Sequence, residues 1–205
     1  VAKMHAAGYD IVMVGHEGHP EVEGTMGQLT GGMHLVETID DVQHLQVRDP
    51  GRLAYVTQTT LSLDDAAAVI AALKQRFPGI AEPKRADICY ATQNRQDAVK
   101  LMAPQVDIVI VVGSPNSSNS NRLREVAERV GVPAYLVDSA SQLDPAWFLG
   151  RQRVGVTAGA SAPEVLVDEL LGALKRLGAA SVRKLDGVHE DVVFPMPMGL
   201  GHVTI

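Results

Sequence analysis

The sequence has little cysteine, no long apolar run and no excess of positive charge. One cysteine among 205 residues excludes an internal disulfide framework and is typical of a reducing compartment. No stretch approaches the about 18 consecutive apolar residues that a membrane span requires, and no signal peptide is visible. A formal net charge of −6 without a basic patch disfavours nucleic acid as a partner. We therefore expect a cytoplasmic protein that binds neither membranes nor nucleic acid.

The composition is that of a folded globular chain. Hydrophobic residues make up 46% and charged residues 20% of the sequence, and the length allows one large domain or two small ones. The chain opens at Val1 rather than methionine, and residues 1–7, followed by Gly8, resemble the last turns of a helix. Because a protein seldom starts inside a helix, we interpret the sequence as a piece of a longer protein.

Short apolar runs alternate with helical patterns along the chain. This alternation predicts parallel sheets covered by helices on both faces, an α/β fold. The predicted strands are residues 10–14, 34–37, 53–57, 88–91, 107–112, 134–137 and 153–157, and the predicted helices are residues 40–45, 63–77, 94–103, 119–130, 141–149 and 162–177.

A segment rich in proline and charge, residues 77–87, predicts a boundary between two consecutive small parallel-sheet units. We place the first unit at residues 1–84, beginning within a helix, and the second at 85–178. Residues 179–205 are expected to form a tail that packs back on the body, with residues 192–194 as one returning strand.

Four loops of small polar residues follow predicted strands, at residues 15–27, 57–62, 113–121 and 157–164. Loops at the carboxyl ends of parallel strands bind ligands in α/β folds. Hydroxyls, amides and free backbone N–H groups at helix N-termini bind anions without lysine or arginine. Helix caps and turns would explain any one loop. They explain less well the third loop, which has six hydroxyl or amide side chains between Ser114 and Ser120. No loop matches a P-loop or a nucleophile elbow.

The first loop contains His16, His19 and Glu21, which suggest three interpretations. The three side chains could ligate a metal ion for hydrolysis, although Gly18 and Pro20 oppose the helix that would put both histidines on one face. A histidine could instead bind an anion while Glu21 acts as general acid. The loop could also be purely structural. The spacing alone leaves these alternatives open.

The single cysteine, Cys89, lies in the predicted strand 88–91, shortly before a helix expected from Asn94. Such a residue is usually an inert buried thiol. A thiolate near a helix N-terminus could instead ligate a metal, although one cysteine cannot hold a cluster. From the residues alone, we infer an α/β protein with an anion site between two units.

Five motifs stand out between about residues 15 and 164. They are HPEVEGTMGQ (19–28), VTQTTLS (56–62), DICYATQNRQ (87–96), VVGSPNSSNSNRL (111–123) and VGVTAGASAPE (154–164). Together these motifs closely resemble, in order and in spacing, the 4-hydroxy-3-methylbut-2-enyl diphosphate reductase family, the iron–sulfur enzymes of the last step of the non-mevalonate isoprenoid pathway.

The resemblance implies a fold of three α/β units with pseudo-threefold symmetry around a 4Fe-4S cluster, of which this chain would supply the last two. Three cysteines, one from each unit, hold the cluster in the family. Cys89 matches one of them, and the other two would lie in an N-terminal third that this sequence lacks. The implied partners are that missing portion of the same protein and a reduced ferredoxin- or flavodoxin-type electron donor.

The resemblance also implies the reaction, the reductive dehydroxylation of (E)-4-hydroxy-3-methylbut-2-enyl diphosphate to isopentenyl and dimethylallyl diphosphate. Glu21 matches the family's proton donor, and Thr59 matches the threonine that contacts the substrate hydroxyl and relays the proton. The alternative is an organic-diphosphate binding module without redox activity. The residues that match diphosphate ligands of the family are His19, Ser117, Ser118, Asn119 and Ser161.

Overall fold

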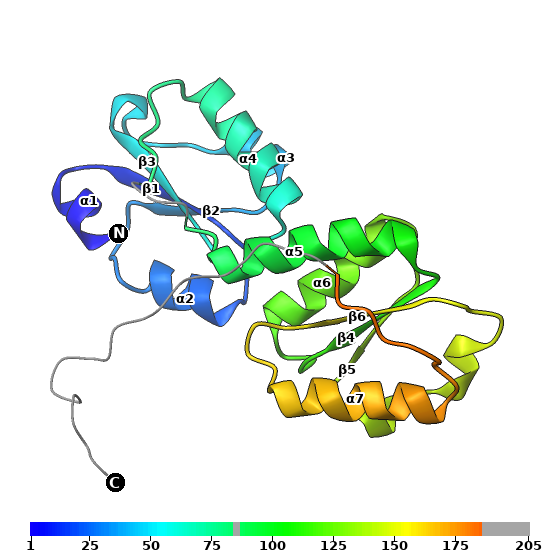
Figure 1. Ribbon diagram of the computed structural model, residues 1–205. Coiled ribbons are helices and arrows are strands. Elements are labelled where there is room, and N and C mark those ends of the chain that lie inside the picture. The colour runs from blue at the N-terminus through cyan, green and yellow to red at the C-terminus, as the bar shows by residue number, and fades with distance from the viewer. Residues whose placement is uncertain (84–86, 186–205) are drawn as a thin grey trace, which may run out of the picture.

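The computed structural model describes residues 1–83 and 87–185 and has an α/β fold, as the sequence predicts. Two three-stranded parallel sheets have the strand orders β2-β1-β3 and β5-β4-β6. In both sheets the strand that comes first in the chain lies in the middle, so helical crossovers leave from a central strand. Figure 1 shows the two sheets side by side, with α5 between them.

The first sheet and its helices come from the N-terminal part of the chain. Val12 of the central strand pairs with His34 on one side and Tyr55 on the other. All five residues of the central strand are buried, as a strand covered on both faces requires. The elements are α1 (Ala2–Ala6), β1 (Asp10–Val14), α2 (Pro20–Met26), β2 (Met33–Val36), α3 (Ile39–His44), the 3₁₀ turn η1 (Pro50–Arg52), β3 (Leu53–Thr57) and α4 (Leu63–Arg76).

The second sheet repeats this plan. Val109 and Val111 of its central strand pack toward α5 and α6, while Ile108 and Ile110 face α7 on the opposite side, because side chains alternate across a strand. The elements are α5 (Tyr90–Met102), η2 (Ala103–Gln105), β4 (Ile108–Val112), α6 (Ser118–Arg129), β5 (Ala134–Val137), η3 (Ala140–Gln142), η4 (Pro145–Phe148), β6 (Val154–Ala158) and α7 (Glu164–Arg176). Within the described ranges, no helix has the length and apolar character needed to cross a bilayer.

Three local predictions from the sequence are wrong. Residues 88–91 form no strand, because Cys89 caps a helix that begins at Tyr90. Residues 141–149 form two 3₁₀ turns instead of one α-helix. The sequence predicts no helix in the first polar loop, but Pro20–Met26 form α2, because proline at a first helical position is favourable. The helix begins after His16 and His19, so it does not put both histidines on one helical face.

The C-terminal tail is only partly described. Leu185 packs against the core cluster around Val109 and Leu123, on the second sheet. The returning strand predicted at residues 192–194 lies outside the described residues. The unit boundaries given above therefore stay a prediction.

Buried polar contacts join the two halves at the start of α4. The Gln96 side chain of α5 has no exposed surface. Its Nε2 donates to the Leu61 carbonyl oxygen (2.8 Å), and its Oε1 accepts from the Leu63 N–H (3.0 Å). The first N–H groups of a helix have no partner within the helix, so Gln96 satisfies one of them from the other half of the chain.

Replacing Gln96 by Leu keeps the side-chain volume similar and removes both contacts. We expect the free energy of unfolding to fall by about 2–6 kcal/mol, because two polar groups, the Leu61 carbonyl and the Leu63 N–H, each lose a partner worth about 1–3 kcal/mol. Urea unfolding measures the change. Gln93→Leu on the same helix is the matched control and should change little. Equal stability of the two variants would contradict this role of Gln96.

Candidate functional site

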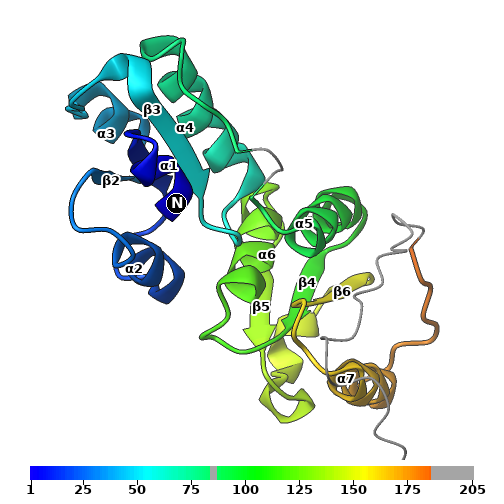
Figure 2. The same ribbon diagram turned by 90° about the vertical axis from the view of Figure 1, so that its left-hand side faces the viewer.

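The site lies where the loop after β1, the loop after β3 and the first turns of α5 and α6 meet. All four segments follow or approach the carboxyl ends of parallel strands, where α/β folds bind ligands. Hydrogen bonds between residues 38 to 106 positions apart in the sequence join segments of this site. Figure 2 shows α2, the helix that follows β1 in the chain, on the same side of the molecule as the start of α6.

Both ring nitrogens of His19 have partners, and one of them links the two halves. It caps α2, and its Nδ1 accepts from the Glu21 backbone N–H (3.1 Å). A neutral imidazole whose Nδ1 accepts carries its hydrogen on Nε2. That nitrogen lies 2.6 Å from Ser118 Oγ, at the start of α6, so His19 donates to Ser118. The serine hydroxyl hydrogen is then free to bind a further acceptor.

Glu21 and Thr59 form a two-point contact. Glu21 Oε1 accepts from the Thr59 backbone N–H, and Oε2 accepts from the Thr59 hydroxyl, both at 3.0 Å. The carboxylate therefore comes from the first turn of α2 and is held against the loop after β3. The two residues matched to a proton donor and its relay are thus in direct contact.

Cys89 is tied to the same threonine. Its backbone N–H donates to the Thr59 carbonyl oxygen (3.1 Å), and its thiol is free and exposed. It occupies the N-cap position of α5, where the helix dipole favours a negatively charged atom. The interpretation of Cys89 as an inert buried thiol is therefore wrong.

The first turn of α6 presents hydroxyl hydrogens outward. Ser117 caps the helix, and its Oγ accepts from the Ser120 N–H (3.3 Å) and from the Ser120 hydroxyl (3.1 Å). With both lone pairs used, the Ser117 hydroxyl can only donate to a new partner. The helix dipole also favours an anion at this end.

Ser120 brings the loops after β4 and β6 together. It is 1% exposed, and a Cβ added at Gly113 or Gly159 would lie 2.2 or 2.1 Å from its Oγ. Neither glycine has a positive φ, so the space that Ser120 fills is what requires glycine at both positions.

Asn119 carries an unsatisfied amide at the same turn. The residue is 6% exposed, and neither its Nδ2 nor its Oδ1 has a hydrogen-bond partner in the described structure. An unpaired buried polar group costs about 1–3 kcal/mol. A ligand that pairs with this amide would recover that cost.

Ser161 is the candidate that the structure does not join to the others. It is exposed in the turn after β6, and within the described residues no hydrogen bond links it to the other candidates. The cap of α7 is Pro163, which has no side-chain capping bond. Gly159, two residues before Ser161, packs beside Ser120.

Sequence reasoning missed two residues that support the site. Gln58, 1% exposed, accepts from the His16 N–H (3.1 Å) and donates to Thr60 Oγ1 (3.0 Å). Asp87 Oδ2 accepts from the Thr57 N–H (3.0 Å). Burial raises the pKa of the Asp87 carboxyl and the charge of Glu21 adds to this, while the hydrogen bond from Thr57 opposes it. Both residues belong to the motifs quoted above, but their partners lie far away in the sequence.

A metal site made by His16, His19 and Glu21 is not supported. Both ring nitrogens of His19 have partners, and His16 Nε2 lies 3.0 Å from an arginine, Arg122. Across residues 1–83 and 87–185, no group of three histidine, cysteine or acidic side chains could hold a metal ion.

Comparison with known proteins gives consistent matches. The model of the LytB protein family matches residues 1–175. The 4-hydroxy-3-methylbut-2-enyl diphosphate reductase of Bordetella pertussis (strain Tohama I) is 70% identical over 200 residues, which cover 98% of this chain and 62% of that protein. The enzyme of the same name from Methylibium petroleiphilum is 68% identical over 201 residues, 98% of this chain and 61% of that protein.

A solved structure has the same fold. It is that of the E-1-hydroxy-2-methyl-but-2-enyl-4-diphosphate reductase from Plasmodium falciparum, with a TM-score of 0.87 and 35% identity. The match covers 94% of this chain and 61% of that one, so this chain spans less than two thirds of the length of these relatives. Together, the family match, the relatives and the shared fold confirm the resemblance in the sequence motifs: the chain belongs to the LytB protein family, whose relatives named here are 4-hydroxy-3-methylbut-2-enyl diphosphate reductases.

Proposed function

We propose that this chain supplies the diphosphate-binding and proton-donating part of an enzyme that reductively removes the hydroxyl group of (E)-4-hydroxy-3-methylbut-2-enyl diphosphate, giving isopentenyl and dimethylallyl diphosphate. The names of its relatives support the substrate and the reaction class. The observation that carries the proposal is the buried amide of Asn119, which has no hydrogen-bond partner among the described residues and lies beside two serine hydroxyls that are free to donate.

The diphosphate would bind at the first turn of α6. Ser117, Ser118 and the Asn119 Nδ2 group are all donors there, and each is held by contacts within the protein or by burial. Donors fixed in advance stabilise a charged ligand without reorganising. The Asn119 Oδ1 atom can accept from a protonated phosphate oxygen or a hydroxyl of the ligand. Ser161 would contribute a further hydroxyl from the neighbouring loop.

Glu21 would hold the proton that the leaving hydroxyl needs. Its carboxyl group contacts the Thr59 hydroxyl at 3.0 Å, so a substrate hydroxyl bound to Thr59 is one hydrogen bond away from the acid. Proton delivery through such a pair makes water the leaving group. His19 fixes the entry to α2 through the Glu21 N–H and so sets the position of the acid.

Cys89 would supply one thiolate to an iron–sulfur cluster. The fit rests on its exposed thiol, its place at the N-terminus of α5 and its link to Thr59. When bound, a 4Fe-4S cluster supplies the two electrons that cleavage of the carbon–oxygen bond requires, delivered by a reduced ferredoxin- or flavodoxin-type protein. The remaining cysteine ligands must come from outside this chain, which has one cysteine.

A second candidate function follows from that single cysteine. The chain taken alone would bind an organic diphosphate and carry out no redox chemistry. Anaerobic reconstitution with iron and sulfide separates the two candidates when it is applied to the chain completed with the part of its relatives that it does not span. Stoichiometric 4Fe-4S absorbance of the completed protein favours the first candidate, and pyrophosphate binding without that absorbance favours the second.

Replacing Cys89 by Ser tests the cluster ligand. In a protein completed with the part of its relatives that this chain does not span, we expect the reconstituted variant to lose the iron–sulfur absorbance. Pyrophosphate binding, measured by calorimetry, should be unchanged, because no hydrogen bond within the described residues joins the free Cys89 thiol to the donors of α6 in the proposed site. An unaltered cluster spectrum would remove Cys89 as a ligand.

Replacing Glu21 by Gln in the same completed protein tests the acid. Gln keeps an oxygen that can accept from Thr59 but carries no transferable proton. We expect kcat to fall about 10²–10⁴-fold, with little change in substrate affinity. Glu23→Gln, an exposed neighbour on α2, is the control and should retain normal turnover. Near-normal turnover of the Glu21 variant would exclude it as the proton donor.

A further inference from the structure

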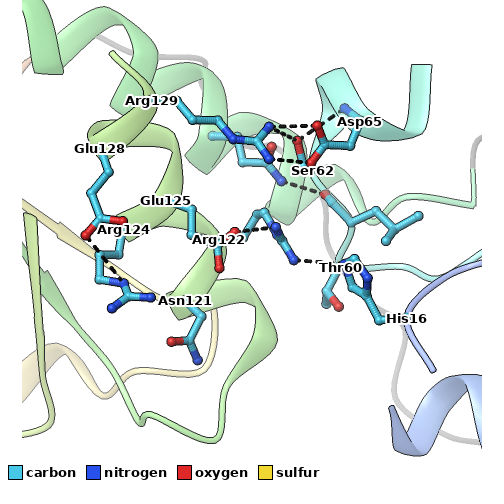
Figure 3. Close-up of polar contacts among 12 residues, drawn as sticks. His16, Thr60, Ser62, Asp65, Asn121, Arg122, Arg124, Glu125, Glu128 and Arg129 are labelled. Atoms are coloured by element: carbon cyan, nitrogen blue, oxygen red, sulfur yellow. Dashed lines mark hydrogen bonds and ion pairs between the residues drawn. The ribbon is translucent and has the colours of Figure 1, made fainter. Parts of the chain in front are cut away.

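Two arginines of α6 reach across to the first half of the chain. Arg122 and Arg129 are seven residues apart, which is about two helical turns, so both lie on one face of the helix. Figure 3 shows Arg129 at Asp65 and Ser62, and Arg122 at His16. One helix therefore contacts the first half at two separate points.

The contact at Arg129 is the stronger of the two. Its guanidinium donates to both carboxylate oxygens of Asp65 (2.8 and 2.6 Å) and to Ser62 Oγ (3.3 Å). Bidentate arginine–carboxylate pairs are among the strongest hydrogen-bonded contacts in proteins. A second pair, Lys100 Nζ with Asp64 Oδ1 (2.8 Å), and the buried Gln96 amide lie at the same end of α4. We call this group of contacts the anchor.

The contact at Arg122 is different in kind. Its side chain is 12% exposed, and one terminal nitrogen forms an ion pair with Glu125 on its own helix. The other, Nη2, lies 3.0 Å from His16 Nε2. Because arginine has only donors, His16 must accept with an unprotonated nitrogen, and a neutral acceptor binds more weakly than the carboxylate of Asp65.

The Arg122–His16 contact is a second link between the loop and the helix that His19 and Ser118 already join. His16 lies three residues before His19, and Arg122 lies four residues, about one turn, after Ser118. The same loop and the same helix are therefore joined twice, at His19–Ser118 and at His16–Arg122. Gln58 holds the His16 backbone N–H from the other side (3.1 Å), so a shift of His16 would also disturb the loop that carries Thr59.

We propose that the Arg122–His16 contact is a latch that holds the loop of residues 15–19 against the first turn of α6, while the anchor fixes the other end of the interface. Arg122 is thus a positioning residue: it aligns His19 and Ser118 without touching the ligand. The inference rests on the proposed diphosphate function. It adds that the Arg122–His16 contact sets the distance between the two halves of the diphosphate site.

The test compares Arg122→Gln with Arg124→Gln in the whole chain. Arg124 lies on the same helix and pairs with Glu128 one turn along (4.0 Å), so it controls for the loss of one positive charge. Calorimetry measures the binding of inorganic pyrophosphate. Hydrogen exchange measures the protection of backbone amides in residues 15–22 and 117–121 without ligand.

For Arg122→Gln we expect faster exchange in both segments and roughly tenfold weaker pyrophosphate binding, the usual effect of losing one hydrogen bond from a charged donor. Arg122→Lys keeps a donor for His16 and should recover part of the affinity, which a purely packing role would not predict. His16→Ala should weaken binding to a similar extent, and adding it to Arg122→Gln should cause little further loss.

The outcomes separate the latch from the proposed function. If the unmodified chain does not bind pyrophosphate but Arg122→Gln still speeds exchange in both segments, the latch stands and the diphosphate function fails. If the chain binds pyrophosphate and Arg122→Gln matches Arg124→Gln in both affinity and exchange, the latch is refuted. Additive losses in the double variant would also refute it.

Discussion

The hydrogen bond between His19 and Ser118 is the interaction on which the rest of the site depends. It joins His19 Nε2 and Ser118 Oγ, which lie 2.6 Å apart and come from the two halves of the chain, 99 positions apart in the sequence. Each sheet is parallel, so its loops gather at the carboxyl ends of its strands, but neither sheet alone makes the site. The histidine hydrogen that reaches Ser118 is fixed by the Glu21 N–H on the opposite ring nitrogen. The same contact thus sets the place of the Glu21 side chain on one side and of the Ser118 hydroxyl on the other.

The polar side chains of the site differ in how many of their hydrogen-bonding groups have partners. The side chains of Gln58 and Glu21 make two hydrogen bonds each, those of Glu21 both with Thr59, whereas the buried Asn119 amide makes none within the described residues. Buried polar groups without a partner are rare in native proteins, and a bound ion is one of the partners that can satisfy them. Gly113 and Gly159 make room for Ser120 beside this amide, so the surrounding packing is close and a shift of Asn119 toward another partner would be resisted.

Much of the fold could be predicted from the sequence, because strands such as 10–14 and 53–57 are short apolar runs followed by turn residues. The short helix α2 could not, since glycine and proline usually break helices, and here Pro20 occupies the first helical position. The loop chemistry predicts an anion site and the motifs predict roles for Glu21 and Thr59; the structure brings these two side chains into contact, and the anion site and the roles stay predictions. No pattern in the sequence predicts the contacts of Arg122 with His16 and of Gln96 with Leu61. These partners come together only when α5 and α6 pack against the first half of the chain.

A crystal structure of the chain with inorganic pyrophosphate tests the central claim most directly. The account predicts phosphate oxygens at hydrogen-bond distance, about 2.7–3.2 Å, from Asn119 Nδ2 and from the hydroxyls of Ser117 and Ser118. The His19–Ser118 contact should be intact in that structure. Pyrophosphate bound elsewhere, with the Asn119 amide paired to the protein itself, would contradict it.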